Sequence, residues 1–176
     1  MSDGSIEMLV TALRGWLDAL AIRTAHFVAH SMVGVLIRDL ALRGPERVLS
    51  CTLVASTGFG TKTDADYING VVTADGCKLL KSYFEKLFAG GSRVTHQLVD
   101  DVLKCKLLDD VGSALGLLVA IFVLDDQQSW VFCDRLAELN VPLLVVWGAR
   151  DQILSARHAA GLSHTERFRS LTTACT

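Results

Sequence analysis

The spacing of hydrophobic and polar residues predicts alternating helices and strands along the first third of the chain. From Ser5 to Leu20 the apolar residues recur every three or four positions, which places them on one face of a helix. Residues 25–29 form a short apolar run typical of a buried strand, and residues 32–43 return to helical spacing. Residues 48–56 predict a second buried strand. Alternation of this kind builds a parallel sheet with crossover helices.

The stretch from residue 57 to residue 140 differs from the first third in composition and spacing, and it predicts an inserted group of helices. Its first part, residues 58–76, is rich in Gly, Thr and Asp and predicts a loop. Helical spacing follows at residues 78–88, 94–108 and 111–124. We therefore expect about three helices between two parts of the sheet.

The clearest strand signal lies at residues 141–148, where a proline stands near the start and a glycine ends the apolar run. A loop that contains Asp151 follows, and then a last helix at about residues 155–162. The predicted fold class is α/β, with a parallel sheet of about three strands and flanking helices. A chain of 176 residues suits a single domain, which we take as residues 1–176.

Hydropathy, net charge and cysteine spacing limit the kinds of partner and ligand that the sequence predicts. Hydrophobic residues make up 51% of the chain, and the mean hydropathy of +0.38 indicates surfaces that require covering by further chain or by a partner. The net charge is −2 with both signs interspersed, so no basic stripe predicts binding to nucleic acid. Five cysteines are spread singly, without the spacing of a metal site.

Two segments bear on location. The N-terminal sequence lacks a basic region followed by an apolar run, so we expect no secretory signal and a cytoplasmic protein. The most apolar run, residues 114–124, has about half the length that a bilayer-spanning helix needs. We expect no membrane association and interpret this run as a buried or partner-facing helix.

The stretch FVAHSMVG, residues 27–34, carries the candidate chemistry. Ser31 follows the first predicted strand directly and precedes a helix. A serine on such a sharp turn projects above the edge of the sheet, and the amide of the next residue, Met32, points at a developing oxyanion. The turn favours small residues two positions before and after the serine; Ala29 meets this requirement and Val33 does not. The alternative is that Ser31 is an ordinary turn serine.

Residues 27–56, FVAHSMVGVLIRDLALRGPERVLSCTLVAS, resemble the nucleophile-elbow region of α/β-hydrolase-fold proteins. Residues 141–162, VPLLVVWGARDQILSARHAAGL, resemble the later strand and acid-bearing loop of the same family. The two motifs stand about 120 residues apart in the family's order. The resemblance implies an α/β-hydrolase fold in which residues 57–140 form a helical cap.

The cap sequences TGFGTKTDADYINGVV and RVTHQLVDDVLKCKLLDD are similar to those of the acyltransferase (dihydrolipoyl acetyltransferase-like) component of bacterial acetoin dehydrogenase complexes. This resemblance implies acyl ester or thioester chemistry on a small acyl substrate, through a serine acyl-enzyme. It calls for no cofactor and no metal. It also raises the hypothesis that the chain assembles into a dehydrogenase complex.

Carried over by position, the resemblance makes Ser31 the nucleophile, Asp151 the triad acid and Met32 the backbone oxyanion donor. The alternative for Asp151 is a carboxylate that only caps its loop. The family's histidine follows the acid by some 25 residues, which falls at or past Thr176, so the catalytic histidine is unknown.

The five histidines of the chain offer no convincing base. We expect His26 to be a core or edge residue, and His30 to point to the opposite side of the turn from the serine. His96 belongs to the predicted cap. His158 and His164 follow the acid loop, and only His164 is retained as a remote substitute.

The chain departs from the family's pattern at both ends. The strands that precede the elbow, and the loop that gives a second oxyanion donor, would lie before Met1. We therefore expect an incomplete hydrolase domain whose nucleophile strand lies at an open sheet edge that favours self-association. Two hypotheses remain open: an acyl hydrolase or acyltransferase that is impaired in this chain, and an inactive fragment that serves at most as a binding or assembly module.

Overall fold

The computed structural model describes residues 4–88, 93–160, 162 and 168–173. The helices are α1 (Gly4–Ala19), α2 (Val33–Arg43), α3 (Ala65–Thr73), α4 (Cys77–Glu85), α5 (His96–Lys106), α6 (Val111–Phe122) and α7 (Arg157–Ala160). The strands are β1 (Ala25–His30), β2 (Val48–Val54), β3 (Val123–Leu124), β4 (Gln127–Gln128), β5 (Leu143–Gly148) and β6 (Phe168–Thr173). Two short 3₁₀ turns lie at Pro45–Arg47 and Cys133–Glu138.

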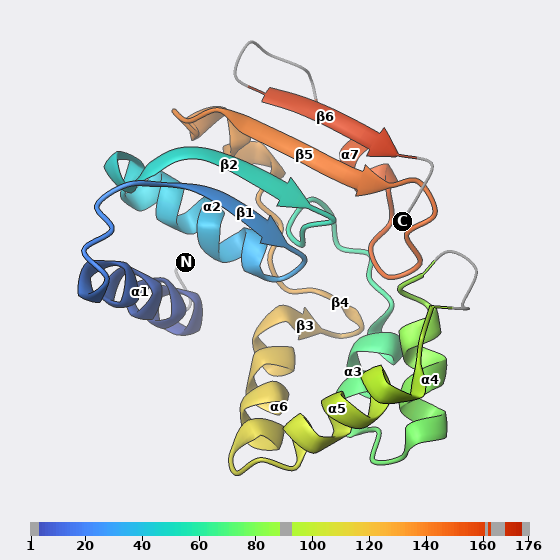
Figure 1. Ribbon diagram of the computed structural model, residues 1–176. Helices are drawn as coiled ribbons and strands as arrows, with labels where there is room; N and C mark the ends of the chain where they lie inside the picture. Colours follow the sequence, from blue (N-terminus) through green and yellow to red (C-terminus); the bar gives the residue numbers. More distant parts are fainter. Residues whose placement is uncertain (1–3, 89–92, 161, 163–167, 174–176) are drawn as a thin grey trace.

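The main sheet is parallel and has the strand order β1-β2-β5-β6 (Figure 1). The three strands that the sequence predicts are β1, β2 and β5. The pattern did not predict β6, which adds a fourth strand on the far side of β5. Strand β1 lies at the other edge of the described sheet, as expected for the nucleophile strand. Because the strands are parallel, the carboxyl ends of β1, β2 and β5 all lie on the same side of the sheet.

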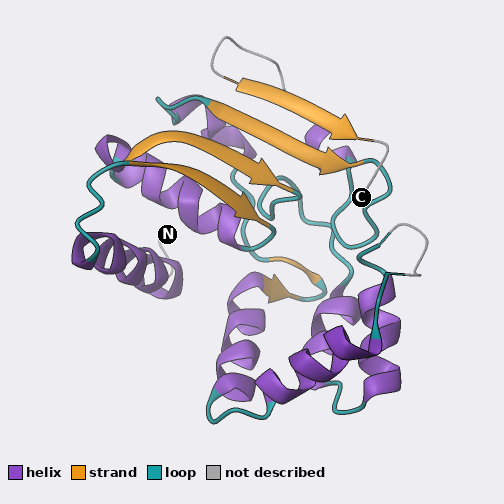
Figure 2. Ribbon diagram, viewed as in Figure 1, coloured by secondary structure: helices purple, strands orange, loops and turns teal. Residues whose placement is uncertain are grey.

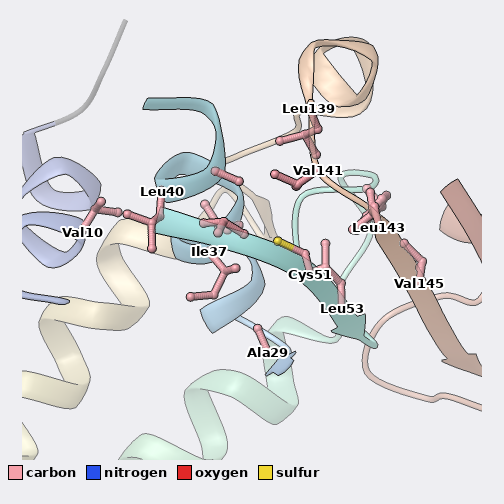
Figure 3. Close-up of a cluster of buried hydrophobic side chains, with 14 of the residues drawn as sticks. Val10, Ala29, Ile37, Leu40, Cys51, Leu53, Leu139, Val141, Leu143 and Val145 are labelled. Atoms are coloured by element: carbon pink, nitrogen blue, oxygen red, sulfur yellow. The ribbon is translucent and has the colours of Figure 1, made fainter. Parts of the chain in front are cut away.

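The core forms where α2 packs against the sheet (Figure 3). Leu40 of α2, Leu53 of β2 and Val145 of β5 have no exposed surface. Helix α2 begins directly after the elbow and ends at Arg43, with Gly44 as its C-cap, and its apolar residues meet the strands at three- and four-residue spacing. This packing fixes the start of α2, and therefore the elbow, against the end of β2.

Helices α3 to α6 form a separate layer beyond the ends of the strands (Figures 1 and 2). We call this group the helical layer. It has its own small core, made by Ala74, Leu80, Phe84, Val94 and Val99. Two predictions are wrong here: residues 65–73, predicted as loop, form α3, and residues 123–124, predicted as the end of a helix, form strand β3.

Helix α1 is buried along only part of its apolar face. Ile6, Val10 and Leu17 are buried, whereas Trp16 is 61% exposed, and Leu20, directly after the helix, is 51% exposed. In α6, the predicted buried or partner-facing helix, Leu117 is 67% exposed. In the part of the chain that the structure describes, none of the helices combines the length and the apolar character that crossing a membrane requires.

Candidate active site

Ser31 sits on a strained turn between β1 and α2. Its φ angle is +54°, in the left-handed region that side-chain-bearing residues rarely adopt. The turn is tied to the sheet, because the Ser31 N–H donates to Val54 O at 3.0 Å and Ser31 O accepts from Thr57 N at 3.1 Å. Backbone strain of this kind costs about 1–3 kcal/mol and persists where the surroundings enforce it. The strand, the turn and the helix therefore match an elbow that presents a serine side chain.

The residue that must be small beside the elbow is Gly34. The position considered from the sequence is Val33, one residue earlier. A Cβ on Gly34 would lie 1.9 Å from Ser56 Oγ and 2.7 Å from Ser56 Cβ, and Ser56 is fully buried. Val33, by contrast, is 43% exposed, so its side chain does not crowd the described turn. Glycine at position 34 lets α2 approach the end of β2 and hold the elbow in place.

The Met32 amide is available beside the serine. The amides of Gly34 and Val35 donate to Ser31 O and Met32 O, which begins helix α2. Within the described residues, the Met32 N–H donates no hydrogen bond. A free amide next to the nucleophile position is what an oxyanion donor requires.

Asp151 lies in the loop that follows β5 and organises that loop. Its Oδ1 accepts hydrogen bonds from the amides of Ile153 and Leu154, both at 2.9 Å. This is the loop-capping role that the sequence left open as an alternative. No hydrogen bond to Asp151 Oδ2 is found among the residues that the structure describes. The carboxylate is thus fixed through one oxygen and can accept a further donor through the other.

The structure brings Ser31 and Asp151 to one cavity of about 290 Å³ at the carboxyl ends of β1, β2 and β5. The polar residues that line it also include His30, Lys86 and Arg150. Sequence reasoning missed Lys86 and Arg150. Lys86 comes from just beyond α4, so the helical layer contributes a cation to the same cavity as the serine.

A second, largely apolar cavity of about 210 Å³ adjoins the elbow. Ser31 and Met32 line it on the side of the sheet. Residues of α3 and α6 line the opposite side: Tyr67, Ile68, Val71, Val72, Leu115, Leu118, Val119 and Phe122. An apolar group attached to the serine would fit between the sheet and the helical layer.

A chain of hydrogen bonds ties the start of α3 to the acid loop. Asp64 caps the helix by accepting from Tyr67 N at 2.9 Å, and its own amide donates to Ile153 O at 2.9 Å. Lys86 Nζ lies 2.7 Å from Asp64 Oδ2. Burial alone would raise the pKa of Asp64, but the bonds with Lys86 and Tyr67 outweigh it and hold the pKa below its ordinary value.

His30, the last residue of β1, is exposed and is among the residues that line the same cavity as Ser31. That its ring points to the opposite side of the turn from the serine stays a prediction. No hydrogen bond joins His30 to Ser31 or Asp151 among the described residues. His164, the retained substitute for the base, lies outside the described residues.

His158 is half-buried, packs against a core residue and is not among the residues that line either cavity. Its ring meets buried Trp147 edge to face, with 6.1 Å between the centroids. Burial lowers the pKa of His158; the charge of Asp151 raises it and that of Lys62 lowers it. In the described ranges, no cluster of three or more His, Cys, Asp or Glu side chains is arranged to hold a metal ion.

A parallel sheet with a strained serine turn after one strand, an acid loop after another and a helical layer over both defines an α/β hydrolase. Residues 2–171 match the sequence family described as alpha/beta hydrolase fold, and the chain belongs to that family.

Two of its relatives are dihydrolipoyllysine-residue acetyltransferase components of an acetoin cleaving system. The one from Cupriavidus necator is 41% identical over 144 residues, which cover 82% of this chain and 38% of the relative. The one from Pseudomonas putida is 36% identical over 159 residues, covering 90% of this chain and 42% of the relative. The chain therefore spans about two fifths of the length of these relatives.

A similar solved structure is the meta-cleavage product hydrolase from Pseudomonas fluorescens, with a TM-score of 0.79 and 19% identity. The alignment covers 95% of this chain and 62% of that hydrolase. At this level of identity the likeness concerns the fold.

Proposed function

We propose that the chain is part of a cytoplasmic, serine-dependent acyl ester or thioester hydrolase or acyltransferase, related to the acetoin-system acetyltransferase component. The observation that carries the proposal is the strained Ser31, which faces the cavity that Asp151 also lines. An unstrained turn would suffice for a serine with no chemical task. The identity to the acetoin-system relatives supports the acyl chemistry.

In the proposed reaction, Ser31 Oγ attacks the carbonyl carbon of a small acyl ester or thioester. The Oγ–acyl bond forms, the bond to the leaving alcohol or thiol breaks, and the serine proton passes through a base to the leaving group. The free Met32 amide donates to the oxyanion, and Asp151 orients the base. Water then releases the acyl group as an acid, or an acceptor thiol or alcohol takes it. No cofactor enters these steps.

The described residues do not include a general base that is hydrogen-bonded to Asp151. Asp151 accepts hydrogen bonds from two amides of its own loop, and no histidine of the described residues bonds to it. Loss of the histidine alone from such a triad lowers the rate by several powers of ten. We therefore propose that this chain is impaired relative to a complete hydrolase.

The same observation favours a second candidate, an inactive module that binds or assembles without catalysis. Assembly into a dehydrogenase complex, the hypothesis that the sequence resemblance raises, belongs to this candidate, and the two relatives are likewise components of an acetoin cleaving system. In that case the helical layer and the sheet retain the ligand cavity but not the chemistry.

A serine-reactive fluorophosphonate probe separates the two candidates. We expect slow covalent labelling of the purified chain that is lost in Ser31→Ala and kept in Ser56→Ala, a buried serine outside both cavities. Intact mass and peptide mapping would locate the adduct. A folded protein that takes no label at Ser31 would rule out the enzymatic proposal and leave the binding module.

A further inference from the structure

Tyr67 of α3 lines both of the cavities that Ser31 lines. The two cavities share four lining residues, namely Ser31, Tyr67, Ile153 and Leu154. Of these, only Ser31 and Tyr67 carry a side-chain hydroxyl. An acyl group bonded at Ser31 would thus lie in a space that Tyr67 also lines.

The backbone of Tyr67 is held rigidly in this place. Its amide donates to the Asp64 cap, and the Asp64 amide donates to the acid loop at Ile153 O. One turn further along α3, a Cβ on Gly70 would come within 2.0 Å of the ring of Tyr83, so glycine there lets α4 pack closely on α3. The tyrosine is therefore anchored both to the acid loop and to the helix behind it.

The Tyr67 hydroxyl is free to serve a ligand. Within the described part of the chain, no residue forms a hydrogen bond with it. Burial, followed by the nearby charges of Asp151 and Asp64, raises the pKa of Tyr67 to about 12. A phenol with such a pKa keeps its proton throughout the working pH range, so it acts as a donor and not as a base.

We propose that Tyr67 is a catalytic residue whose hydroxyl donates a hydrogen bond to the carbonyl oxygen of an acyl group at Ser31, beside the Met32 amide. The expected effect of Tyr67 on the reaction rate rests on the proposed function, because it requires that Ser31 is the nucleophile. It supplies from the helical layer a second oxyanion donor, which the described elbow does not itself provide. Removing one such donor lowers the rate by about 10²–10³-fold in serine hydrolases.

The kinetic test compares Tyr67→Phe with Tyr83→Phe. Both variants lose one hydroxyl from the helical layer, but Tyr83 is not among the residues that line either cavity. We expect the rate of Ser31 labelling by the fluorophosphonate to fall by about 100-fold in Tyr67→Phe and to stay within about twofold in Tyr83→Phe. Equal rates in the two variants would overturn the inference while leaving Ser31 as a nucleophile.

A binding test does not depend on chemistry at Ser31. The probe is 2-pentanone carrying ¹³C at its carbonyl, whose resonance moves downfield when the oxygen accepts a hydrogen bond. We expect this shift with the wild-type chain, Ser31→Ala and Tyr83→Phe, and the loss of most of it with Tyr67→Phe. If the shift depends on Tyr67 but Ser31 takes no label, the proposed function is wrong and the donor role stands. No shift with the wild-type chain, or the same shift with Tyr67→Phe, overturns the donor role.

Discussion

Gly34 shows how a single residue holds the elbow. Its α-carbon faces fully buried Ser56, whose Oγ would lie 1.9 Å from an added Cβ. We expect Gly34→Ala to lower the free energy of unfolding by about 1–3 kcal/mol, the usual cost of overpacking a core. Urea denaturation followed by circular dichroism measures the change.

Gly116→Ala is the matched control, because Gly116 also lies in a helix but has open space where its Cβ would be. There the substitution should raise stability by about 0.5–1 kcal/mol through helix propensity. Adding Ser56→Gly to Gly34→Ala should recover part of the loss. If Gly34→Ala and Gly116→Ala shifted stability equally, the contact with Ser56 would not limit the approach of α2.

His158 links stability to pH. Its folded-state pKa is lowered, chiefly by burial, so the fold favours the neutral imidazole. As the pH falls through the ordinary value of about 6.5, the unfolded chain takes up a proton more readily than the folded chain, and stability is lost. We expect His158→Gln to flatten the dependence of the unfolding free energy on pH between about 7 and 5. Exposed His96→Gln controls for the loss of one imidazole; an unchanged slope in His158→Gln would contradict the assignment.

Residues with a local signature could be predicted from the sequence, and residues placed by tertiary contacts could not. The turn at Ser31 and the loop at Asp151 follow directly from their strands, so their motifs identify the positions, and the structure brings both to one cavity. Tyr67 and Lys86 reach that cavity from helices whose distance from the sheet is set by packing. No spacing along the chain reports such a contact.

At the scale of elements, the start of α3 couples the helical layer to the acid loop. Asp64 both caps α3 and pairs with Lys86, and its side chain is 22% exposed. We expect Asp64→Ala to cost about 1 kcal/mol of unfolding free energy, mainly from the lost cap. Asp66→Ala is the control: it removes the longer contact of 3.3 Å to the same lysine from a side chain that is 75% exposed. Such exposed pairs contribute little, so a loss as large as that of Asp64→Ala would show that the ion pair, and not the cap, dominates.

Helix α3 and strand β6 show why elements were missed. Residues 58–76 contain many Gly, Thr and Asp residues, which normally indicate a loop. Gly70 weakens the helical signal, yet it is required because the ring of Tyr83 occupies the space of its Cβ. Strand β6, with the sequence FRSLTT, lacks the apolar run of β5 and forms by pairing with β5 in parallel register. In both cases a neighbouring element overrides the local propensity.

At the scale of the whole molecule, the site is divided between two layers. The sheet supplies Ser31 and Asp151, and the helical layer supplies Tyr67 and Lys86. The bond between Asp64 N and Ile153 O joins the layers directly beside the cavity. Motion of the helical layer would therefore change the ligand cavity, and through Phe122 of α6, which is buried in the main core, it would also affect the packing beneath the sheet.

The position of β1 at the edge of the described sheet predicts self-association of the chain. Val28 of β1 is 76% exposed, and an exposed edge strand pairs readily with another chain. We expect concentration-dependent self-association in light scattering and binding of a hydrophobic dye, both reduced by Val28→Lys, because lysine on an edge strand opposes pairing. Leu117→Lys on α6 is the control, since it removes a comparably exposed apolar side chain, 67% accessible, away from the strand. A monomer with a sharp, cooperative melt, or an equal effect of the two lysines, would show that β1 does not mediate association.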